Sequence, residues 1–300
     1  MSINKISFIV PCFNASNTIE ICIKSILSQL EYNNDEIIII NDGSNDQTNQ
    51  IINQYRKHEN FIIKEHKYNR GLASARNTGI NNASGDILIF VDSDMKLNQC
   101  WLSKIKKIFE NESIVGVMGQ YTFPRKMVFN QLDHYLYSKS RGPQRKYNNG
   151  DKIHWKYFLF SNTAIKRTAL TKVIGFNEAF TQYGGEDTEL AIRLNEVYPN
   201  GLYYYSELTS YHYGQKKLEL HCLNQRNYGK INLHKLINMY PEHKKNLAGN
   251  WLTSWYGYLI FNDVLILVVD WVLKRTTINL FVKYKIAYNV IMGYRSSGNN

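Results

Sequence analysis

Residues 1–121 alternate between short apolar runs and segments with helical spacing, and this alternation constrains the fold more than any other feature. The runs that predict strands are residues 6–11, 36–44 (ending in a turn), 61–66, 86–92 and 114–121. The segments that predict helices are residues 16–30, 46–58, 71–83 and 101–111. Such alternation predicts an α/β fold, a doubly wound and mainly parallel sheet with helices on both faces.

Helix starts are also marked in this part of the chain. Asn17, with Glu20 three residues later, predicts an N-cap pair for the first helix. Asp46 predicts a cap for the second helix.

Polar side chains follow three of the predicted strands, at residues 11–14, 41–44 and 92–94. Doubly wound sheets bind ligands at the carboxyl ends of their strands, so these residues are the expected site.

Asp92 and Asp94 flank Ser93 in LIFVDSDM, directly after the fourth predicted strand. Carboxylates are costly to hold where water is scarce. A hard cation such as Mg²⁺ or Mn²⁺ prefers carboxylate oxygens and would bridge a diphosphate. The alternative is a polar turn at the end of a strand, since D-x-D also occurs by chance.

Asp42, in NDGS, has two interpretations as well. Asn-Asp-Gly-Ser is turn chemistry whatever its role. A carboxylate at this edge of the sheet could also accept a hydrogen bond from a base N–H or a ribose hydroxyl.

Glu186, Asp187 and Glu189, in YGGEDTEL, stand at a predicted helix start. Acids in a first helical turn complement the helix dipole, which is one explanation. The preceding glycine pair lets the backbone approach a ligand, and a carboxylate there could act as a general base.

His212 lies between tyrosines in SYHYG. It can be interpreted as a packed aromatic ring or as a metal ligand. Arg76, in ASARN, is either an exposed helix residue or a partner for Asp42 or a phosphate.

The remaining chain is less regular. Residues 122–155 predict a long functional or mobile loop. Residues 158–176 predict a strand and a helix, residues 183–198 a glycine turn and a helix, and residues 201–214 a pair of strands. After about residue 215 the composition becomes basic and aromatic with helical periodicity.

Bulk composition narrows the class of partner and compartment. The formal net charge of +11 favours an anionic partner: nucleic acid, acidic phospholipid or a phosphorylated small molecule. Four scattered cysteines without a C-x-x-C pair favour reduced thiols in the cytoplasm. The N-terminus passes directly into a predicted strand, so we expect no signal peptide.

Six segments in order resemble the family-2 glycosyltransferases of the GT-A fold. They are FIVPCFNA, IIIINDGSNDQT, NRGLASARNTGI, GDILIFVDSDM, SNTAIKR and GFNEAFTQYGGEDTELAIRL. The resemblance covers about residues 4–121 and 157–213. It implies transfer of a sugar from a nucleoside diphosphate donor, a UDP-sugar, to an acceptor hydroxyl with inversion.

The resemblance also implies roles for individual residues. Asp187, with Glu186 beside it, would be the base that deprotonates the acceptor. Asp42 would contact the uracil, and Asp94 would bind the metal, Mn²⁺ or Mg²⁺. The other residues expected at the donor are Pro11, Phe13, Asn14, Gly71, Arg76, Asp92 and Ser93.

YGGEDTEL also looks like a segment of bacterial chondroitin-type polymerases, polypeptide GalNAc-transferases and β-1,4-galactosyltransferases. In the first two groups a later histidine completes the metal shell, and His212 stands at about that position. This favours galactose or N-acetylgalactosamine over glucose. With one base and in-line displacement the anomeric centre inverts, since a covalent intermediate would need a second carboxylate as nucleophile.

The resemblance gives a domain prediction: a catalytic domain over residues 1–214 and a helical extension over residues 215–300. Within the first, residues 1–121 would bind the nucleotide sugar and residues 122–214 would form the acceptor half. Two departures stand out. Asn41 replaces a commonly acidic residue before Asp42, and the QxxRW signature of processive synthases is absent, so a product-extruding polymerase is not expected.

Other functions fit less well. A sugar nucleotidyltransferase needs a glycine-rich loop with a catalytic basic residue after the first strand, and an oxidoreductase needs G-x-G-x-x-G there. PCFNASNT supplies neither. A basic nucleic-acid-binding protein would fit the charge but leaves three acidic clusters unexplained, so we expect no nucleic-acid partner.

The C-terminal segment raises a membrane question. Residues 258–273 are strongly apolar, but Asn262, Asp263 and Asp270 argue against a spanning helix. Trp and Tyr residues flank the stretch, and Lys274 and Arg275 follow it, which fits either peripheral contact with the inner membrane surface or a helix packed on the catalytic domain. The expected acceptor is a glycan or lipid-linked glycan in bacterial surface polysaccharide (capsule) or lipooligosaccharide assembly.

Overall fold

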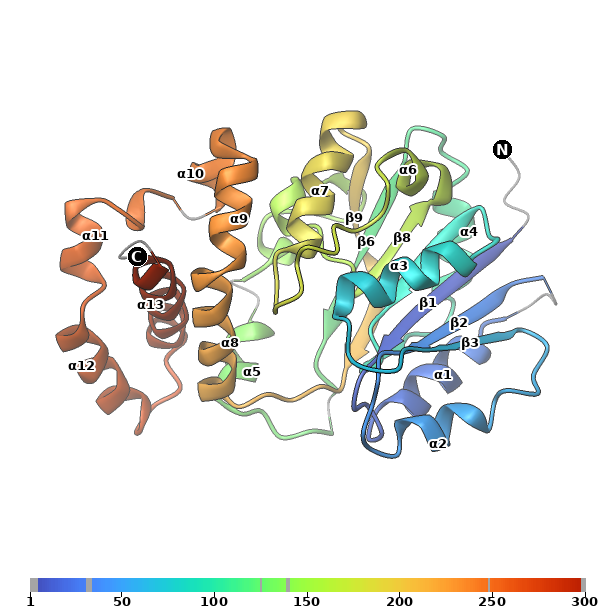
Figure 1. Cartoon of the computed structure of the whole chain (residues 1–300), viewed down its shortest axis with the longest axis horizontal. Coiled ribbons are helices and arrows are strands. Elements are labelled where there is room, and N and C mark those ends of the chain that lie inside the picture. Colours follow the sequence, from blue (N-terminus) through green and yellow to red (C-terminus); the bar gives the residue numbers. More distant parts are fainter. Residues whose placement is uncertain (1–4, 31–33, 125, 139–140, 248, 298–300) are drawn as a thin grey trace. The chain divides into compact units, whose positions relative to one another are not determined.

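The computed structural model describes residues 5–30, 34–124, 126–138, 141–247 and 249–297. Within them, residues 6–212 contribute one mixed sheet of nine strands (Figure 1). The strands are β1 (Ile6–Cys12), β2 (Glu36–Asn41), β3 (Phe61–Glu65), β4 (Ile87–Val91), β5 (Met95–Leu97), β6 (Gly116–Thr122), β7 (Asp151–Lys152), β8 (Asn162–Lys166) and β9 (Leu202–His212). Their order is β3-β2-β1-β4-β8-β6-β9-β5, with β7 paired to β9.

The first four strands are parallel, as the strand–helix alternation predicts. β8 then enters antiparallel between β4 and β6, and β6 runs parallel to β9. β5 and β7 are antiparallel to β9. The predicted α/β fold is confirmed.

The chain divides into two compact units. Unit 1 comprises residues 1–125, 142–181 and 186–214, and unit 2 comprises residues 126–141, 182–185 and 215–300. That residues 1–214 and 215–300 are separate domains stays a prediction.

Helices cover both faces of the sheet in unit 1 (Figure 1). They are α1 (Ile19–Leu27), α2 (Thr48–Asn53), α3 (Leu72–Asn82), α4 (Trp101–Ile108), α6 (Arg167–Lys172) and α7 (Glu186–Val197), with 3₁₀ helices at Pro143–Arg145 and Trp155–Tyr157. Phe8 and Val10 of β1 share a core with α1 and α4. Ile9 points to the opposite face, where a Cβ on Gly79 of α3 would lie 2.4 Å from its Cγ2. Gly79 therefore lets α3 pack directly against the sheet, which brings the neighbouring residues of α3 close to the sheet as well.

Unit 2 is helical. Its helices are α5 (Gln131–Leu136), α8 (Leu218–Lys230), α9 (Asn232–Met239), α10 (Lys244–Leu247), α11 (Trp255–Ile260), α12 (Asp263–Leu273) and α13 (Asn279–Ser297), with 3₁₀ helices at Pro241–His243 and Gly249–Trp251. Gly229 of α8 and Gly293 of α13 lie where the two helices pack closely. A Cβ on either would come within about 2 Å of the other helix's backbone, at Val290 O and Arg226 O respectively.

Three local predictions were wrong. Residues 201–214, predicted as a pair of strands, contain the single strand β9. β9 stays one strand because it pairs with β6 along one edge, with a register shift, and with β5 and β7 along the other. Helix α1 begins at Ile19, and its N-cap Thr18 makes no side-chain capping bond, so Asn17 is not the cap. The predicted loop over residues 122–155 contains α5, which Asn130 and Asp133 start with a capping box.

Asp46 accepts the backbone N–H of Thr48, so it serves the start of α2 although Gln47 is the N-cap residue. All four cysteines are free thiols. None of the helices in the described ranges is long and apolar enough to cross a membrane.

Candidate active site

A buried arginine holds two of the predicted acids together. Arg76, on α3, has only 1% of its surface exposed. Its Nη2 donates to Oδ1 of Asp92 at 3.1 Å, and its Nη1 donates to Oδ1 of Asp187 at 2.5 Å. Arg76 is therefore neither an exposed helix residue nor a partner of Asp42.

The charge of Arg76 is maintained by these acids. Burial opposes a charged guanidinium, but the carboxylates of Asp187 and Asp92 outweigh it and raise the pKa of Arg76. The guanidinium also lies 5.2 Å from the centre of the Phe176 ring. The cluster is thus a fixed cation between acids from two separate segments.

Asp187 is held at both carboxylate oxygens. Oδ1 accepts from Arg76, and Oδ2 accepts the backbone N–H of Phe160 at 3.1 Å. Asp187 lies in the first turn of α7, which follows directly on Gly184 and Gly185. Charge-assisted bonds at both oxygens fix the orientation of the carboxylate.

Glu186, the neighbour of Asp187, has a different environment. Its side chain is buried, and Oε2 has no hydrogen-bond partner among the described residues. Burial and the charge of Asp187 raise the pKa of Glu186 to about 7, against the opposing effect of Arg76, whose Nη1 lies 4.0 Å from Oε1. Glu186 therefore keeps its proton to a higher pH than an ordinary glutamate does.

Asp92 follows β4 directly. Burial raises the pKa of Asp92, while the charge of Arg76 opposes this rise. Because 31% of the side chain remains exposed, water offsets part of the effect of burial. Ser93 is half-buried in the turn between β4 and β5.

Asp94 and His212 meet through strand pairing. β5 pairs with β9 so that Met95 lies opposite His212, and Tyr213 N donates to Asp94 O at 2.8 Å. Asp94 Oδ2 lies 3.2 Å from His212 Nε2. Gly214 leaves room for this pair, because a Cβ there would lie 2.1 Å from Asp94 Oδ2.

Asp42 is buried at the end of β2 and accepts several protein donors. Its Oδ1 and Oδ2 accept the backbone N–H groups of Arg70 and Gly71, each at 2.9 Å. His66 Nδ1 lies 2.6 Å from Oδ1, and His66 Nε2 lies 2.9 Å from Thr78 Oγ1. Asp42 therefore ties β3 to the start of α3, where Gly71 is the N-cap residue.

The predicted donor residues at the end of β1 make no hydrogen bond to Asp42. Pro11 is buried within β1, and Phe13 is 46% exposed. Asn14 takes a positive φ of 49° and accepts the N–H of Asn45 at 2.8 Å. Its own N–H donates to Ser44 Oγ at 3.0 Å, which joins the loops after β1 and β2.

The geometry thus gives three groups: Arg76 with the acids Asp92, Asp187 and Glu186, the pair Asp94–His212, and Asp42 with its donors. The family model for glycosyl transferase family 2 matches residues 7–174, more than half of the chain. The chain belongs to this family.

Relatives of this family-2 glycosyltransferase match parts of it. Glycosyltransferase GlyA of Streptococcus pneumoniae serotype 4 is 39% identical over 121 residues, 40% of this chain and 17% of GlyA. Poly-β-1,6-N-acetyl-D-glucosamine synthase of Staphylococcus epidermidis is 45% identical over 89 residues, 30% of this chain and 21% of the synthase. The uncharacterized glycosyltransferase YfnE of Bacillus subtilis (strain 168) is 26% identical over 238 residues, 64% of this chain and 61% of YfnE. The chain spans less than two thirds of each relative's length.

Solved structures confirm the GT-A fold. Residues 1–349 of TarS from S. aureus superpose with a TM-score of 0.61 at 17% identity, covering 98% of this chain and 90% of that one. The same fragment was crystallised with UDP-GlcNAc. Mannosyltransferase PcManGT from Pyrobaculum calidifontis, in complex with GDP-Man and Mn²⁺, superposes with a TM-score of 0.59 at 16% identity, covering 96% of this chain and 86% of that one.

The donor atoms of Asp94 and His212 fit a divalent cation in this glycosyltransferase. A carboxylate oxygen and an imidazole nitrogen are ligands that Mn²⁺ accepts. Two neighbouring ligands at about 2.1 Å from an octahedral ion lie about 3 Å apart, close to the observed 3.2 Å. Both side chains are partly exposed, so an ion and its water ligands have access.

Three residues of the site went unnoticed in the sequence: His66, Phe160 and Gly214. His66 is the last residue of the third predicted strand and directly follows β3, so the rule that selects strand ends could have found it. Phe160 acts through its backbone N–H, and Gly214 through its missing side chain, so neither leaves a chemical signal in the sequence.

Proposed function

We propose that this chain is an inverting glycosyltransferase that moves a hexose, of the galactose, N-acetylgalactosamine or glucose type, from a UDP-sugar to an acceptor hydroxyl. The observation that carries the proposal is the carboxylate of Asp187, held at both oxygens and joined through Arg76 to Asp92 at the end of β4. Family membership supplies the reaction class. The choice of UDP rests on TarS, which was crystallised with UDP-GlcNAc.

Asp187 is the proposed base. The acceptor O–H proton passes to its carboxylate, and the acceptor oxygen forms a bond to the anomeric carbon of the donor sugar. The bond from that carbon to the diphosphate oxygen breaks, and UDP leaves with the electron pair. A single displacement of this kind inverts the anomeric centre. Arg76 and the N–H of Phe160 keep the carboxylate oriented for this proton transfer.

The donor would lie along the strand ends of the first four strands. Asp42, with Pro11, Phe13 and Asn14, is proposed at the nucleotide, and Gly71 at the start of α3. Asp92 and Ser93 are proposed at the ribose and donor sugar. Arg76 contributes by positioning Asp92, because its guanidinium is buried against that carboxylate.

Asp94 and His212 would hold Mn²⁺ or Mg²⁺. The ion would supply positive charge to the diphosphate leaving group. Gly214 and the β5–β9 pairing keep the two ligands together.

The acceptor is proposed as a glycan or lipid-linked glycan of bacterial surface polysaccharide synthesis. Support comes from the similarity to poly-β-1,6-N-acetyl-D-glucosamine synthase, a polysaccharide synthase by name.

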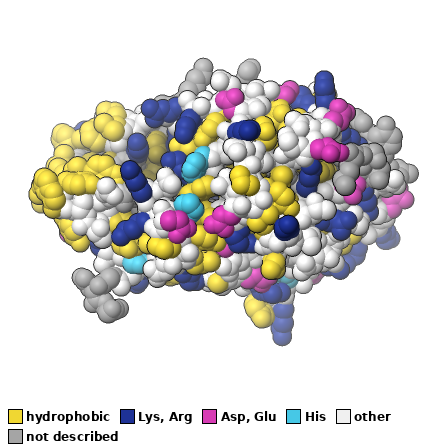
Figure 2. Space-filling view, turned by 90° about the horizontal axis from the view of Figure 1, so that it is seen from above, with side chains coloured by type: hydrophobic (Ala, Val, Ile, Leu, Met, Phe, Trp, Pro, Cys, Tyr) yellow, Lys and Arg dark blue, Asp and Glu magenta, His cyan; other side chains and the backbone are white. Residues whose placement is uncertain are grey.

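The outer face of α11 and α12 is proposed to contact the inner surface of the cell membrane peripherally. Val264, Leu267, Val268 and Trp271 recur at helical spacing on α12 and are all exposed. Hydrophobic side chains gather at the left of Figure 2, over this end of unit 2. Val269 and Leu273 of the same helix are buried within unit 2, so α12 packs inward on one side only. An exposed apolar helix face with aromatic side chains and following basic residues is suited to contact with a membrane interface.

The test is nucleotide release with Mn²⁺ from UDP-galactose, UDP-N-acetylgalactosamine, UDP-glucose, UDP-GlcNAc and GDP-mannose, for the wild type and Asp94→Ala. We expect metal-dependent release from a UDP-sugar that falls at least about 100-fold in the variant. No release from any donor, together with salt-sensitive binding of nucleic acid, would overturn the proposal.

A further inference from the structure

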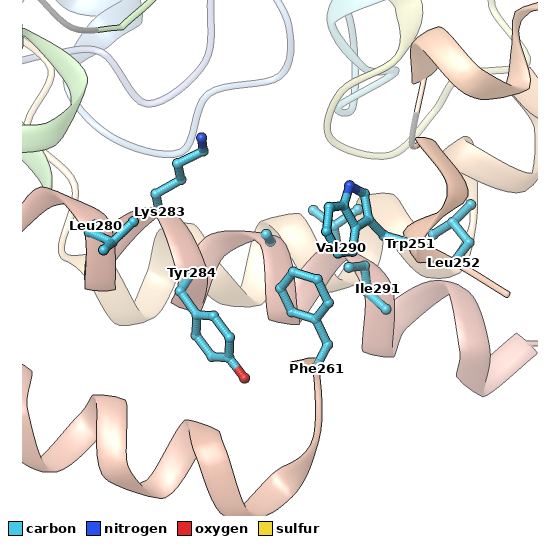
Figure 3. Close-up of a pocket in the computed structure, with 9 residues that line it drawn as sticks. Trp251, Leu252, Phe261, Leu280, Lys283, Tyr284, Val290 and Ile291 are labelled. Atoms are coloured by element: carbon cyan, nitrogen blue, oxygen red, sulfur yellow. The ribbon is translucent and has the colours of Figure 1, made fainter. Parts of the chain in front are cut away.

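Unit 2 contains an apolar cavity of about 450 Å³. It lies against α13 and is closed by the segments that carry Trp251 and Phe261 (Figure 3). The lining residues are Trp251, Leu252, Phe261, Leu280, Lys283, Tyr284, Ala287, Val290 and Ile291. Its size falls in the range of small-molecule sites, roughly 300–1,000 Å³.

The walls of this cavity are tied together by hydrogen bonds. Arg295 of α13 donates to the carbonyl oxygens of Trp251, Leu252 and Phe261, each at 3.1 Å. Tyr284 donates its hydroxyl to Ile260 O at 2.6 Å, and its ring stacks on Phe261 with centroids 5.2 Å apart. The cavity is therefore preformed, and a ligand need not order its walls on binding.

The mostly apolar side chains that line the cavity favour a hydrocarbon ligand. Its polar side-chain groups are the Tyr284 hydroxyl, the Trp251 indole N–H and the Lys283 ammonium, and the hydroxyl already has a partner. Lys283 is exposed and extends away from the Tyr284 and Phe261 rings (Figure 3), so its stem borders the cavity while its charge stays outside. Within the described residues Lys283 forms no ion pair, so its ammonium is available to an anion at the rim.

The exposed apolar face of α11 and α12 belongs to the same unit as the cavity, and two of the residues that line the cavity are exposed as well. Leu280 lines it and is 69% exposed, and Trp251 lines it and is 42% exposed. Basic side chains accompany that face: Lys274 and Arg275 directly follow α12, and the Arg275 guanidinium lies 4.3 Å from the Trp271 ring centre. Aromatic side chains beside basic ones on an apolar surface match the chemistry of an anionic lipid.

We propose that the cavity binds the hydrocarbon chain of a phosphorylated lipid, with Lys283 beside the phosphate. The occupant is a lipid and neither a second copy of the chain nor a peptide, because the basic rim and the apolar interior match a molecule with one anionic end and one apolar tail. This proposal concerns unit 2 alone and does not depend on glycosyl transfer.

The experiment is calorimetric titration of the full chain with dodecyl phosphate below its micelle concentration. We expect saturable binding that weakens with shorter alkyl phosphates, by about two- to four-fold per CH₂ removed. Inorganic phosphate, the control for the charge alone, should not bind at the same concentrations. Equal binding of inorganic phosphate and dodecyl phosphate would overturn the proposal.

Four variants locate the binding. Ala287→Phe fills the cavity, and Leu280→Gln places a polar group on its exposed wall, where the fold tolerates it. Both should weaken dodecyl phosphate binding, by at least ten-fold and three-fold respectively. Lys283→Gln should weaken it three- to ten-fold at low salt. Leu223→Gln, which changes an exposed apolar residue of α8 outside both the cavity and the outer face of α11 and α12, is the matched control and should bind like the wild type.

Two outcomes contradict a lipid site. Binding that stays unchanged in both Ala287→Phe and Leu280→Gln would place the lipid elsewhere. A dimer in sedimentation velocity that Leu280→Gln dissociates would show that a second copy covers this surface.

Discussion

Oδ1 of Asp187 lies 2.5 Å from Nη1 of Arg76, although the two residues are 111 positions apart in the chain. The same guanidinium reaches Asp92 with its other terminal nitrogen. One buried cation thus links the start of α7 to the end of β4, and the two proposed functional acids depend on it for both charge balance and position.

Replacing Arg76 by Lys should be costly although it keeps the charge. A single ammonium cannot reproduce the fork that serves Asp187 and Asp92, so a buried carboxylate loses its partner. We expect a loss of about 2–4 kcal/mol in the free energy of unfolding, measured in urea, and at least about 100-fold in kcat/KM. Arg70→Lys is the matched control, because Arg70 pairs with Glu178 at the surface and should change stability by less than about 0.5 kcal/mol. An Arg76→Lys variant as stable and active as the wild type would refute this role.

Asp187→Asn should separate catalysis from donor binding. The amide oxygen can still accept from Arg76, but the amide NH₂ cannot accept the N–H of Phe160, and neither group can take the acceptor proton. We expect kcat to fall at least about 1,000-fold while the Kd for the UDP-sugar changes less than about three-fold. The measurements are transfer kinetics and calorimetric donor titration. A comparable loss of donor affinity would instead assign Asp187 to the donor site.

Glu186→Gln should change how stability depends on pH. The pKa of Glu186 is about 7 in the folded protein, above its ordinary value of 4.5. Between these values the folded state binds more protons than the unfolded chain, so wild-type stability falls as pH rises from 4.5 to 7 and is then constant. Gln removes this loss, so we expect the variant to be more stable than the wild type at pH 8, on the order of 3 kcal/mol, but not at pH 4. Urea unfolding at both pH values tests this, and a pH-independent difference would contradict it.

Gly214→Ala should disturb the proposed metal site. The added Cβ would lie 2.1 Å from Asp94 Oδ2 and 3.1 Å from His212 Nε2, so the pair must separate. We expect the Mn²⁺ concentration for half-maximal activity to rise about ten- to 100-fold, in line with other changes behind metal ligands. Tyr211→Phe is the matched control. Tyr211 precedes His212 in β9, and neighbouring strand residues point to opposite faces, so its side chain points away from the Asp94–His212 pair. An unchanged Mn²⁺ requirement in Gly214→Ala would count against metal binding by Asp94 and His212.

His66→Ala should weaken donor binding through Asp42. His66 bridges Asp42 and Thr78, so its removal leaves the Asp42 carboxylate with backbone donors alone. We expect KM for the UDP-sugar to rise about three- to 30-fold with a smaller effect on kcat, and a loss of about 1–2 kcal/mol in stability. Initial-rate kinetics at varied donor concentration measure the split. A fall in kcat with unchanged KM would exclude this positioning role.

Much of unit 1 could be predicted, because buried parallel strands are near-continuous apolar runs. The four isoleucines of β2 identify that strand without any knowledge of its neighbours. β5 was missed because Met95–Leu97 is too short to show a period, and it is a strand only through its pairing with β9. Residues 201–214 were divided in two for a related reason, since the register shift within β9 depends on its partner β6.

The candidate site shows the same division. Asp42, Asp92, Asp94 and Asp187 could be selected as candidates because strand ends and a glycine turn mark them locally. The interpretation of Arg76 stayed open because a small-residue helix gives no sign of which side chain will be buried. Burial of Arg76 follows from the close packing of α3 at Gly79 and from acids that arrive from elsewhere in the chain.

The sequence by itself determined which segments become strands and helices in the first half, and which carboxylates stand where those strands end. Apolar periodicity and turn chemistry are local, so a single chain displays them without its fold. The family resemblance already put Asp94 and His212 at one predicted metal site. Only the tertiary structure decided that Asp187 shares a guanidinium with Asp92, and that the β5–β9 pairing brings Asp94 to 3.2 Å from His212. These contacts depend on sheet order and register between distant segments, and they are set by the packing free energy of the whole unit, which no local pattern encodes.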